Sequence, residues 1–329
     1  MNNISKRLIK LFTLVLIAAI AVPMVPIAIA TVSETNIEDN LAPVAQNLSY
    51  ATYRGVAITG TLQAIDPEGD MIEYKLMTES KKGKAELSED GEFTYTPKEG
   101  GKGKDLFTYV AVDDVGNVSE EATVKIDIQK QSSNVTYSDM DDEGGHYAAL
   151  RLAEEGIFVG EMIGERYFFS PDTAVTRGEF LAMCMNMTGE EILEDITRTG
   201  FTDDEEISAW LKPYVTTALM SGTIKGMRSN EGELVFAANE PVTTMQAAVI
   251  LNKVLELADM PDEGKIMNLS APTWAYQATV NLRACDIINA EMGDVYESAM
   301  TRADVAQMIC NTIDVMEEDS VSTLLSWVW

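Results

Sequence analysis

The chain has 329 residues, 46% of them hydrophobic, with 24 basic and 53 acidic side chains that give a net charge of −29. This length suggests two domains, and the apolar fraction is sufficient for folded cores. The charge argues against nucleic acid as a partner, because phosphate binding requires a basic patch.

Residues 1–30 have the composition of a secretory signal peptide. Basic residues precede an apolar stretch, prolines interrupt that stretch, and Ala28-Ile29-Ala30 fits a cleavage site. An uncleaved anchor is the alternative, since the apolar stretch is about twenty residues long. The prolines and the small residues favour cleavage, which predicts an exported protein that has no membrane contact after processing.

Residues 41–130 alternate apolar and polar side chains in short runs, separated by Gly, Pro, Asp and Asn. This pattern is typical of strands joined by turns. The Asp90-Gly91 pair lies between two such runs and predicts a hairpin. Several short strands at this spacing predict an antiparallel all-β sandwich of about ninety residues.

Four motifs in this segment resemble the cadherin-like, Ig-like modules of bacterial surface proteins: APVAQN, AIDPEGDMIEYKL, GEFTYTP and FTYVAVDDVGNVS. The resemblance implies a seven-stranded sandwich that serves as a spacer or adhesive module, with another surface protein as its partner. Some relatives bind calcium, which takes six to eight oxygen ligands, through acidic loops. The alternative is that the acidic loops are simple turns and that no cofactor is required. The candidate calcium ligands are Asp66, Glu68, Asp70, Asp113 and Asp114.

Residues 131–136 form a polar linker, and beyond it apolar residues recur at three- and four-residue spacing. This period predicts six helices in three pairs. The pairs are copies of one unit, which predicts an all-α domain of three repeats over 137–316 and a tail at 317–329. The three copies span residues 137–187, 201–255 and 268–313.

One short phrase recurs before the second helix of each copy, as VTRGEF, VTTMQA and MTRADV. Its threonine stands three residues before a Glu, a Gln or an Asp, which predicts a capping box or a shorter substitute for one. Arg177 and Arg302 follow that threonine at the positive end of the helix dipole, where a cation is disfavoured. We therefore expect either a salt bridge to a neighbouring acid or an anionic ligand beside each arginine.

Three tandem units with an aromatic residue near the start, and with GIFVG in the middle and VTRGEF after the loop in the first copy, resemble S-layer homology domains. The match is strong in the first copy, clear in the third and looser in the second. In that family three repeats form a pseudo-threefold helical body. Its grooves hold secondary cell-wall polysaccharide, often pyruvylated. The resemblance implies that this peptidoglycan-linked glycan is the partner, at the cell wall of a Gram-positive-type bacterium. It implies a binding site formed by Arg177, Arg302, Trp210, Trp274, Asp139, Asp203, Thr176 and Thr301.

In this interpretation the arginines pair with an acidic sugar group, the tryptophans line the grooves and the aspartates bind hydroxyl groups. A guanidinium holds a carboxylate through two hydrogen bonds, and an indole offers a flat face to a sugar ring. Each tryptophan is equally suited to a core position. The second copy has Thr244 in place of the arginine, so at most two grooves are complete.

The predicted function is therefore that of a noncatalytic, wall-anchored surface protein. One histidine, His146, and the absence of a G-x-S-x-G motif argue against a serine hydrolase. The three cysteines Cys184, Cys285 and Cys310 lie in apolar helical patterns, which predicts buried thiols rather than disulfides or a zinc site. The alternative function is a self-assembling surface subunit whose repeats bind mainly protein.

Overall fold

The computed structural model describes residues 40–326 except for four internal gaps at 89, 141–144, 261–270 and 289–296. The predicted signal peptide at residues 1–30 lies outside the described residues. The described chain divides into two compact units, with the boundary between Lys130 and Gln131. Among the described residues, no helix has both the length and the apolar composition that crossing a membrane requires.

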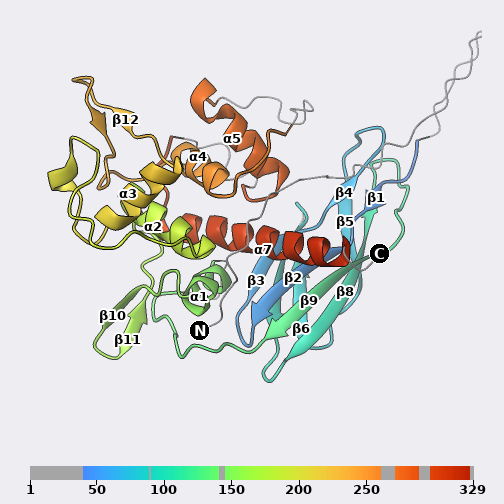
Figure 1. The fold of residues 1–329 in the computed structure, drawn as a ribbon. Helices are drawn as coiled ribbons and strands as arrows, with labels where there is room; N and C mark the ends of the chain where they lie inside the picture. The colour runs from blue at the N-terminus through green and yellow to red at the C-terminus, as the bar shows by residue number, and fades with distance from the viewer. Residues whose placement is uncertain (1–39, 89, 141–144, 261–270, 289–296, 327–329) are drawn as a thin grey trace, which may run out of the picture. The chain divides into compact units, whose positions relative to one another are not determined.

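The first unit is all-β and is built from two main sheets (Figure 1). One sheet has the strand order β2-β9-β8-β5, and the other has the order β3-β7-β6. The strands of the two sheets are β2 (Leu48–Tyr53), β3 (Ile58–Thr61), β5 (Glu73–Thr78), β6 (Gly83–Leu87), β7 (Glu92–Pro97), β8 (Gly103–Val112) and β9 (Ala122–Gln129). A separate short pair joins β1 (Val44–Ala45) to β4 (Ala64–Ile65).

Aromatic side chains pack the two sheets together. The rings of Phe93 on β7 and Phe107 on β8 meet edge to face with centroids 5.2 Å apart. The ring of Tyr50 on β2 contacts Phe93 at the same distance of 5.2 Å. Phe93 and Phe107 are almost fully buried, so the predicted sandwich has a real core.

The hairpin at Asp90-Gly91 is confirmed, but the prediction of a wholly antiparallel sandwich is wrong at one pair. Strands β6 and β7 pair antiparallel, and Gly91 has a φ of 89°, which suits glycine. Strand β2, however, pairs parallel with β9, from Leu48 opposite Val124 to Tyr53 opposite Gln129. Alternation along one strand does not specify the direction of a partner that lies far away in the sequence.

The second unit contains the six predicted helices within its described residues. They are α1 (His146–Glu154), α2 (Arg177–Thr188), α3 (Lys212–Ser221), α4 (Thr244–Val254), α5 (Thr273–Ala284) and α7 (Arg302–Ser326). A 3-10 turn, Asp204–Glu206, precedes α3. In the first two copies a short hairpin separates the helices: β10 (Glu161–Ile163) with β11 (Arg166–Phe168), and β12 (Met227–Arg228) with β13 (Leu234–Val235).

Two details of this unit differ from expectation. Helix α7 continues to Ser326, whereas a separate tail was expected from residue 317. Residues 317–326 contain neither glycine nor proline, so nothing in their composition ends the helix. All three cysteines are free, but only Cys184 and Cys310 are buried, while Cys285 is half-buried.

Candidate functional site

Three loops, one from each copy, form a closed ring of backbone hydrogen bonds. The Val175 N–H donates to the Met300 carbonyl at 3.0 Å, the Met300 N–H to Val242 at 2.9 Å, and the Val242 N–H to Val175 at 2.9 Å. All three side chains are buried. Each loop donates to one neighbour and accepts from the other, so the ring is cyclic, and it brings the N-terminal ends of α2, α4 and α7 together.

The threonine that follows each ring residue caps a helix, as predicted. Thr176 and Thr243 form complete capping boxes with Glu179 and Gln246. In the third copy the Thr301 N–H donates to the Asp304 carboxylate at 2.8 Å, and the Asp304 N–H donates back to the threonine hydroxyl at 3.2 Å. The predicted glycan contacts of Thr176 and Thr301 stay a prediction, because capping alone explains both residues.

The first amides of α2 and α7 are already bound to the neighbouring copy. The Arg177 N–H donates to the Glu240 carbonyl at 2.8 Å, and the Arg302 N–H donates to the Thr173 carbonyl at 2.8 Å. The next amide in each helix, Gly178 and Ala303, also donates to a carbonyl of that neighbouring loop. These amides are therefore not free to hold an anion, and among the described groups at these two helix starts the positive charge comes from the arginine side chains.

Arg177 carries a positive charge that no described acid neutralises. Its Nε donates to the Phe236 carbonyl at 3.1 Å, and its guanidinium carbon lies 5.3 Å from the centre of the Phe236 ring. The residue is only 7% exposed, and burial lowers the pKa of its side chain to about 10. Among the described residues no carboxylate forms an ion pair with Arg177, so a buried cation lacks an anionic partner.

Arg302 occupies the equivalent place but has an acidic partner. Its Nη1 donates to the Phe169 carbonyl at 3.0 Å, and its guanidinium carbon lies 5.3 Å from the centre of the Phe158 ring. Its Nη2 lies 3.1 Å from a carboxylate oxygen of Glu161, whose side chain is 60% exposed. The salt bridge that the sequence offered as the simpler explanation thus forms at this arginine, with a partner that remains accessible to solvent.

Asp139 and Asp203 hold the loops that present these carbonyl groups. The carboxylate of Asp139 accepts the N–H groups of Phe169 and Ser170 at 2.9 and 2.6 Å. The carboxylate of Asp203 accepts those of Phe236 and Ala237 at 3.0 and 2.8 Å. That these aspartates hold a loop was not predicted from the sequence. The equivalent segments FFS (168–170) and VFA (235–237), which follow the aspartates in the first two copies, could have indicated it. Binding of either aspartate to sugar hydroxyls stays a prediction.

The two tryptophans that were predicted to line the grooves are exposed to solvent and are not part of a core. Trp210 is 56% exposed and lies just before α3, and Trp274 is 60% exposed at the start of α5. This exposure argues against the core-filling interpretation. No hydrogen bond or ring contact within the described part of the chain joins either tryptophan to an arginine, so the structure does not assemble all the predicted residues into one site.

Three of the five candidate calcium ligands come together in the β unit. Asp66, Asp70 and Asp113 each offer a carboxylate oxygen, and these oxygens lie within 4.8 Å of one another. Glu68 instead accepts the Leu41 N–H at 3.2 Å, and Asp114 is exposed. The two acidic loops therefore meet, but with three ligands rather than five.

The environment of the cluster suits a hard cation. Asp66 is 8% exposed, its Oδ1 accepts three backbone N–H groups, and its Oδ2 is buried without a hydrogen bond. Burial of Asp113 opposes ionisation, but hydrogen bonds from Asn117 and nearby backbone amides outweigh it and lower the pKa of that carboxyl group. The unused Oδ2 of Asp66, beside two further carboxylates, is the kind of oxygen donor that calcium prefers.

Comparison with known proteins identifies the domain family that the first unit matches. Residues 40–130 match the family model of a bacterial cadherin-like domain. The chain is 30% identical over 145 residues to the surface-layer 125 kDa protein of Lysinibacillus sphaericus, covering 43% of this chain and 12% of that protein. It is 31% identical over 135 residues to exoglucanase XynX of Acetivibrio thermocellus, covering 40% of this chain and 12% of that one. The chain thus spans a small part of each relative.

A solved structure shows only distant likeness. The sialic acid binding region of a Streptococcus sanguinis adhesin aligns with a TM-score of 0.23 and 18% identity, over 30% of this chain and 32% of that one. A likeness of this size carries no argument about ligands. The function of the chain is therefore inferred from the family match and from the geometry of its own residues.

Proposed function

We propose that this chain is a noncatalytic surface protein of a Gram-positive-type bacterium, exported by its first thirty residues and held at the cell wall. Its helical repeats are S-layer homology domains that bind an acidic, pyruvylated secondary wall polysaccharide. The cadherin-like domain is a spacer or adhesive module. The similarity to part of a surface-layer protein supports this assignment, as does the cyclic joining of three copies.

The observation that carries the proposal is the unneutralised charge of Arg177. A cation that is 7% exposed, with only a carbonyl and a ring as described partners, is stabilised by an anion of matching shape. A sugar-borne carboxylate can accept two parallel hydrogen bonds from a guanidinium. At Arg302 the ligand's carboxylate replaces that of Glu161, whose side chain is 60% exposed and can turn into solvent, whereas the Arg302 side chain is only 13% exposed.

Sedimentation of the full chain with purified wall sacculi tests this function. We expect Arg177→Ala to weaken binding more than Arg302→Ala, and the double variant to stay in solution. Extraction of the polysaccharide from the sacculi should abolish binding of the wild type. The matched control is Arg228→Ala, because Arg228 is exposed on β12 and bonds only to the Gly232 carbonyl among the described groups. A double variant that sediments like the wild type would contradict the assignment.

We also propose that the cadherin-like domain binds calcium through Asp66, Asp70 and Asp113. The support is the buried, unpartnered Oδ2 of Asp66 beside two further carboxylates. A bound divalent ion would tie the loop at residue 66 to the loop at residue 113. We expect calcium to raise the melting temperature of the full chain, and Asp66→Asn to remove this shift. Asp114→Asn is the control, and an equal shift in both variants would refute the site.

A further inference from the structure

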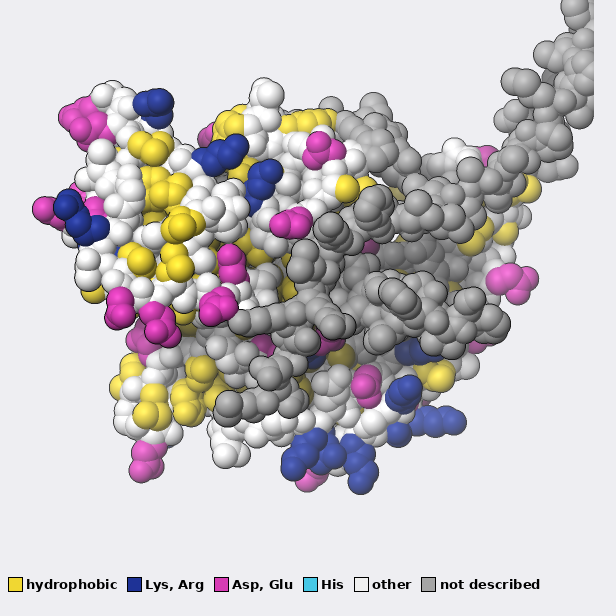
Figure 2. All heavy atoms as spheres, viewed as in Figure 1, with side chains coloured by type: hydrophobic (Ala, Val, Ile, Leu, Met, Phe, Trp, Pro, Cys, Tyr) yellow, Lys and Arg dark blue, Asp and Glu magenta, His cyan; other side chains and the backbone are white. Residues whose placement is uncertain are grey.

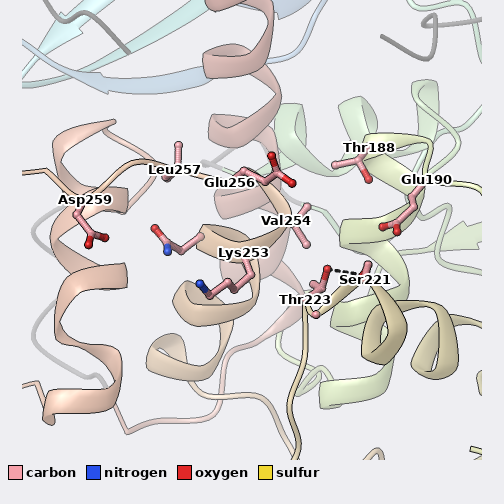
Figure 3. A pocket seen from close by; sticks show the side chains of 11 residues that line it. Thr188, Glu190, Ser221, Thr223, Lys253, Val254, Glu256, Leu257 and Asp259 are labelled. Atoms are coloured by element: carbon pink, nitrogen blue, oxygen red, sulfur yellow. Dashed lines mark hydrogen bonds between the residues drawn. The ribbon is translucent and has the colours of Figure 1, made fainter. Parts of the chain in front are cut away.

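A polar pocket of about 590 Å³ lies in the helical unit where three helices end (Figure 3). Helix α2 ends at Thr188, α3 at Ser221 and α4 at Val254, and each of these residues lines the pocket. The volume is within the range of small-molecule sites. The pocket is distinct from the arginines, because Arg177 starts α2 and a helix of that length places its ends about 18 Å apart.

The electrostatics of this pocket favour a positively charged ligand. Each helix directs its carbonyl end toward the pocket and contributes a partial charge of about −0.5. The charged lining residues are Glu190, Glu256, Asp259 and Lys253, which sum to −2. No ion pair within the described part of the chain engages any of the three carboxylates. Partial burial raises the pKa of the Glu190 carboxyl group.

The remaining lining groups are suited to a ligand with many hydroxyl groups. Thr188, Ser221, Thr223 and Asn252 all line the pocket. The Thr188 and Ser221 hydroxyls donate to carbonyls of their own helices, and the Asn252 side-chain oxygen accepts from Asn281. The hydroxyl oxygens of Ser221 and Thr223 lie 2.9 Å apart, as the dashed line in Figure 3 shows. A hydroxyl oxygen that already donates can still accept a hydrogen bond, and the Asn252 amide nitrogen can donate one, so these groups can bond to sugar hydroxyls.

One acidic residue at the pocket, Glu256, has a backbone conformation that is unfavourable for any residue other than glycine. Glu256 has a φ of 49°, just after α4, where its N–H bonds to the Lys253 carbonyl and the next N–H bonds to the Asn252 carbonyl. Glycine is the residue that such a helix end favours. A glutamate here strains the backbone, and strain of this kind concentrates at functional sites.

We propose that this pocket binds a sugar that carries a free amino group. The ammonium lies between the Glu190 and Glu256 carboxylates, and the ring hydroxyls bond to the hydroxyl and amide groups of the wall. This binding is independent of the wall-polysaccharide site, since it uses no residue at the N-terminal ends of the helices. The chain would then recognise acidic and basic sugar groups at opposite ends of the same repeats.

Calorimetric titration of the full chain with glucosamine and with N-acetylglucosamine tests the proposal. We expect glucosamine to bind about tenfold or more tightly, because acetylation removes the charge, and one charge-assisted hydrogen bond is worth that factor. Equal affinity for the two sugars, or no binding of glucosamine, would overturn the proposal. An alkyl diamine that binds as well as glucosamine would also overturn it, because the pocket would then recognise charge alone.

Three variants separate binding from folding. Glu256→Gly should keep or raise the melting temperature, since it relieves the strained φ, and should still weaken glucosamine binding severalfold. Glu190→Gln should weaken binding similarly, and Lys253→Gln should strengthen it. Arg177→Ala should leave glucosamine binding unchanged, so failure of the wall-anchoring function and failure of this pocket are distinguishable. Undiminished binding by Glu256→Gly and Glu190→Gln would refute the proposed site.

Discussion

Two residues with left-handed backbone follow the phenylalanines that contact the arginines. Ser170 has a φ of 56° and Ala237 a φ of 58°, although neither is a glycine. In both copies an aspartate accepts the N–H of that residue. The same strain recurs at the same place in two copies, so it belongs to the loop shape that brings a carbonyl to each arginine.

Replacing Ala237 by glycine should stabilise the protein. Glycine adopts a positive φ without the steric cost that a Cβ imposes, so we expect Ala237→Gly to raise the free energy of unfolding by about 0.5–1 kcal/mol. Chemical denaturation of the full chain measures this change. Ala278→Gly is the matched control, because Ala278 lies inside helix α5, where glycine should cost about 1 kcal/mol. Equal destabilisation by both substitutions would contradict the argument.

The aspartates that anchor these loops allow a second prediction. Asp203→Ala leaves the Phe236 and Ala237 N–H groups without their acceptor, and unsatisfied amides cost about 1–3 kcal/mol. We expect a lower melting temperature together with weaker sedimentation with sacculi, because the Phe236 carbonyl that holds Arg177 loses its support. If binding is lost while the melting temperature is unchanged, Asp203 contacts the glycan directly instead.

Helices were predictable from the sequence because their signals are local. The recurring threonine with an acid or glutamine three residues later marked the starts of α2, α4 and α7, and apolar spacing marked their buried faces. The parallel pairing of β2 with β9 could not be predicted in this way. Neither could the ring through Val175, since both depend on contacts between segments far apart in the sequence.

The same limit applied to the candidate site. The sequence singled out Arg177 and Arg302 as a pair, and the structure gives them equivalent carbonyl and ring contacts. Among the residues that the structure describes, Arg302 has an acidic partner and Arg177 does not, and this partner is Glu161, which lies on a different copy of the repeat from Arg302. Which acid reaches which arginine is set by tertiary packing, and periodicity along one helix holds no information about it.

The 3-10 turn before α3 contains an ion pair that should respond to acid. Asp204 accepts the Lys212 ammonium at 2.8 Å and the Thr199 N–H at 2.5 Å, and the lysine contact lowers the pKa of its carboxyl group to about 2. A carboxyl whose pKa is lowered by folding stabilises the protein above its usual pKa, and that stability is lost as pH falls toward the folded value.

Asp204→Asn should therefore lower the melting temperature at pH 6. The difference from the wild type should shrink as the pH falls below about 4, and it should disappear only below pH 2, where Asp204 is protonated in the folded as well as the unfolded chain. Thermal unfolding followed by circular dichroism across this range measures it. Glu205→Gln, an exposed substitution in the same turn, is the control and should show little effect. A difference that is independent of pH would mean that shape rather than charge matters at residue 204.

At the scale of the whole molecule the two units differ in charge. Residues 41–130 hold 10 basic and 16 acidic side chains, a net of −6, whereas residues 131–329 hold 11 and 34, a net of −23. Acidic side chains are dispersed over the face in Figure 2 rather than gathered in one patch. A dispersed negative surface keeps the protein soluble and repels an acidic polymer at long range.

The attraction between Arg177 and an acidic sugar group is local, whereas the repulsion between the acidic protein surface and the acidic polysaccharide is long-range, and the two depend differently on salt. Binding to the wall should therefore pass through a maximum as the salt concentration increases. The screening length falls from about 30 Å at 0.01 M salt to about 8 Å at 0.15 M, so added salt removes repulsion between the acidic surface and the polysaccharide first. The contact at buried Arg177 is screened much less. We therefore expect sedimentation with sacculi to increase between 0.01 and about 0.15 M salt and to decrease only at higher concentration. A decrease from the lowest salt onward would show that exposed basic residues, rather than Arg177, bind the wall.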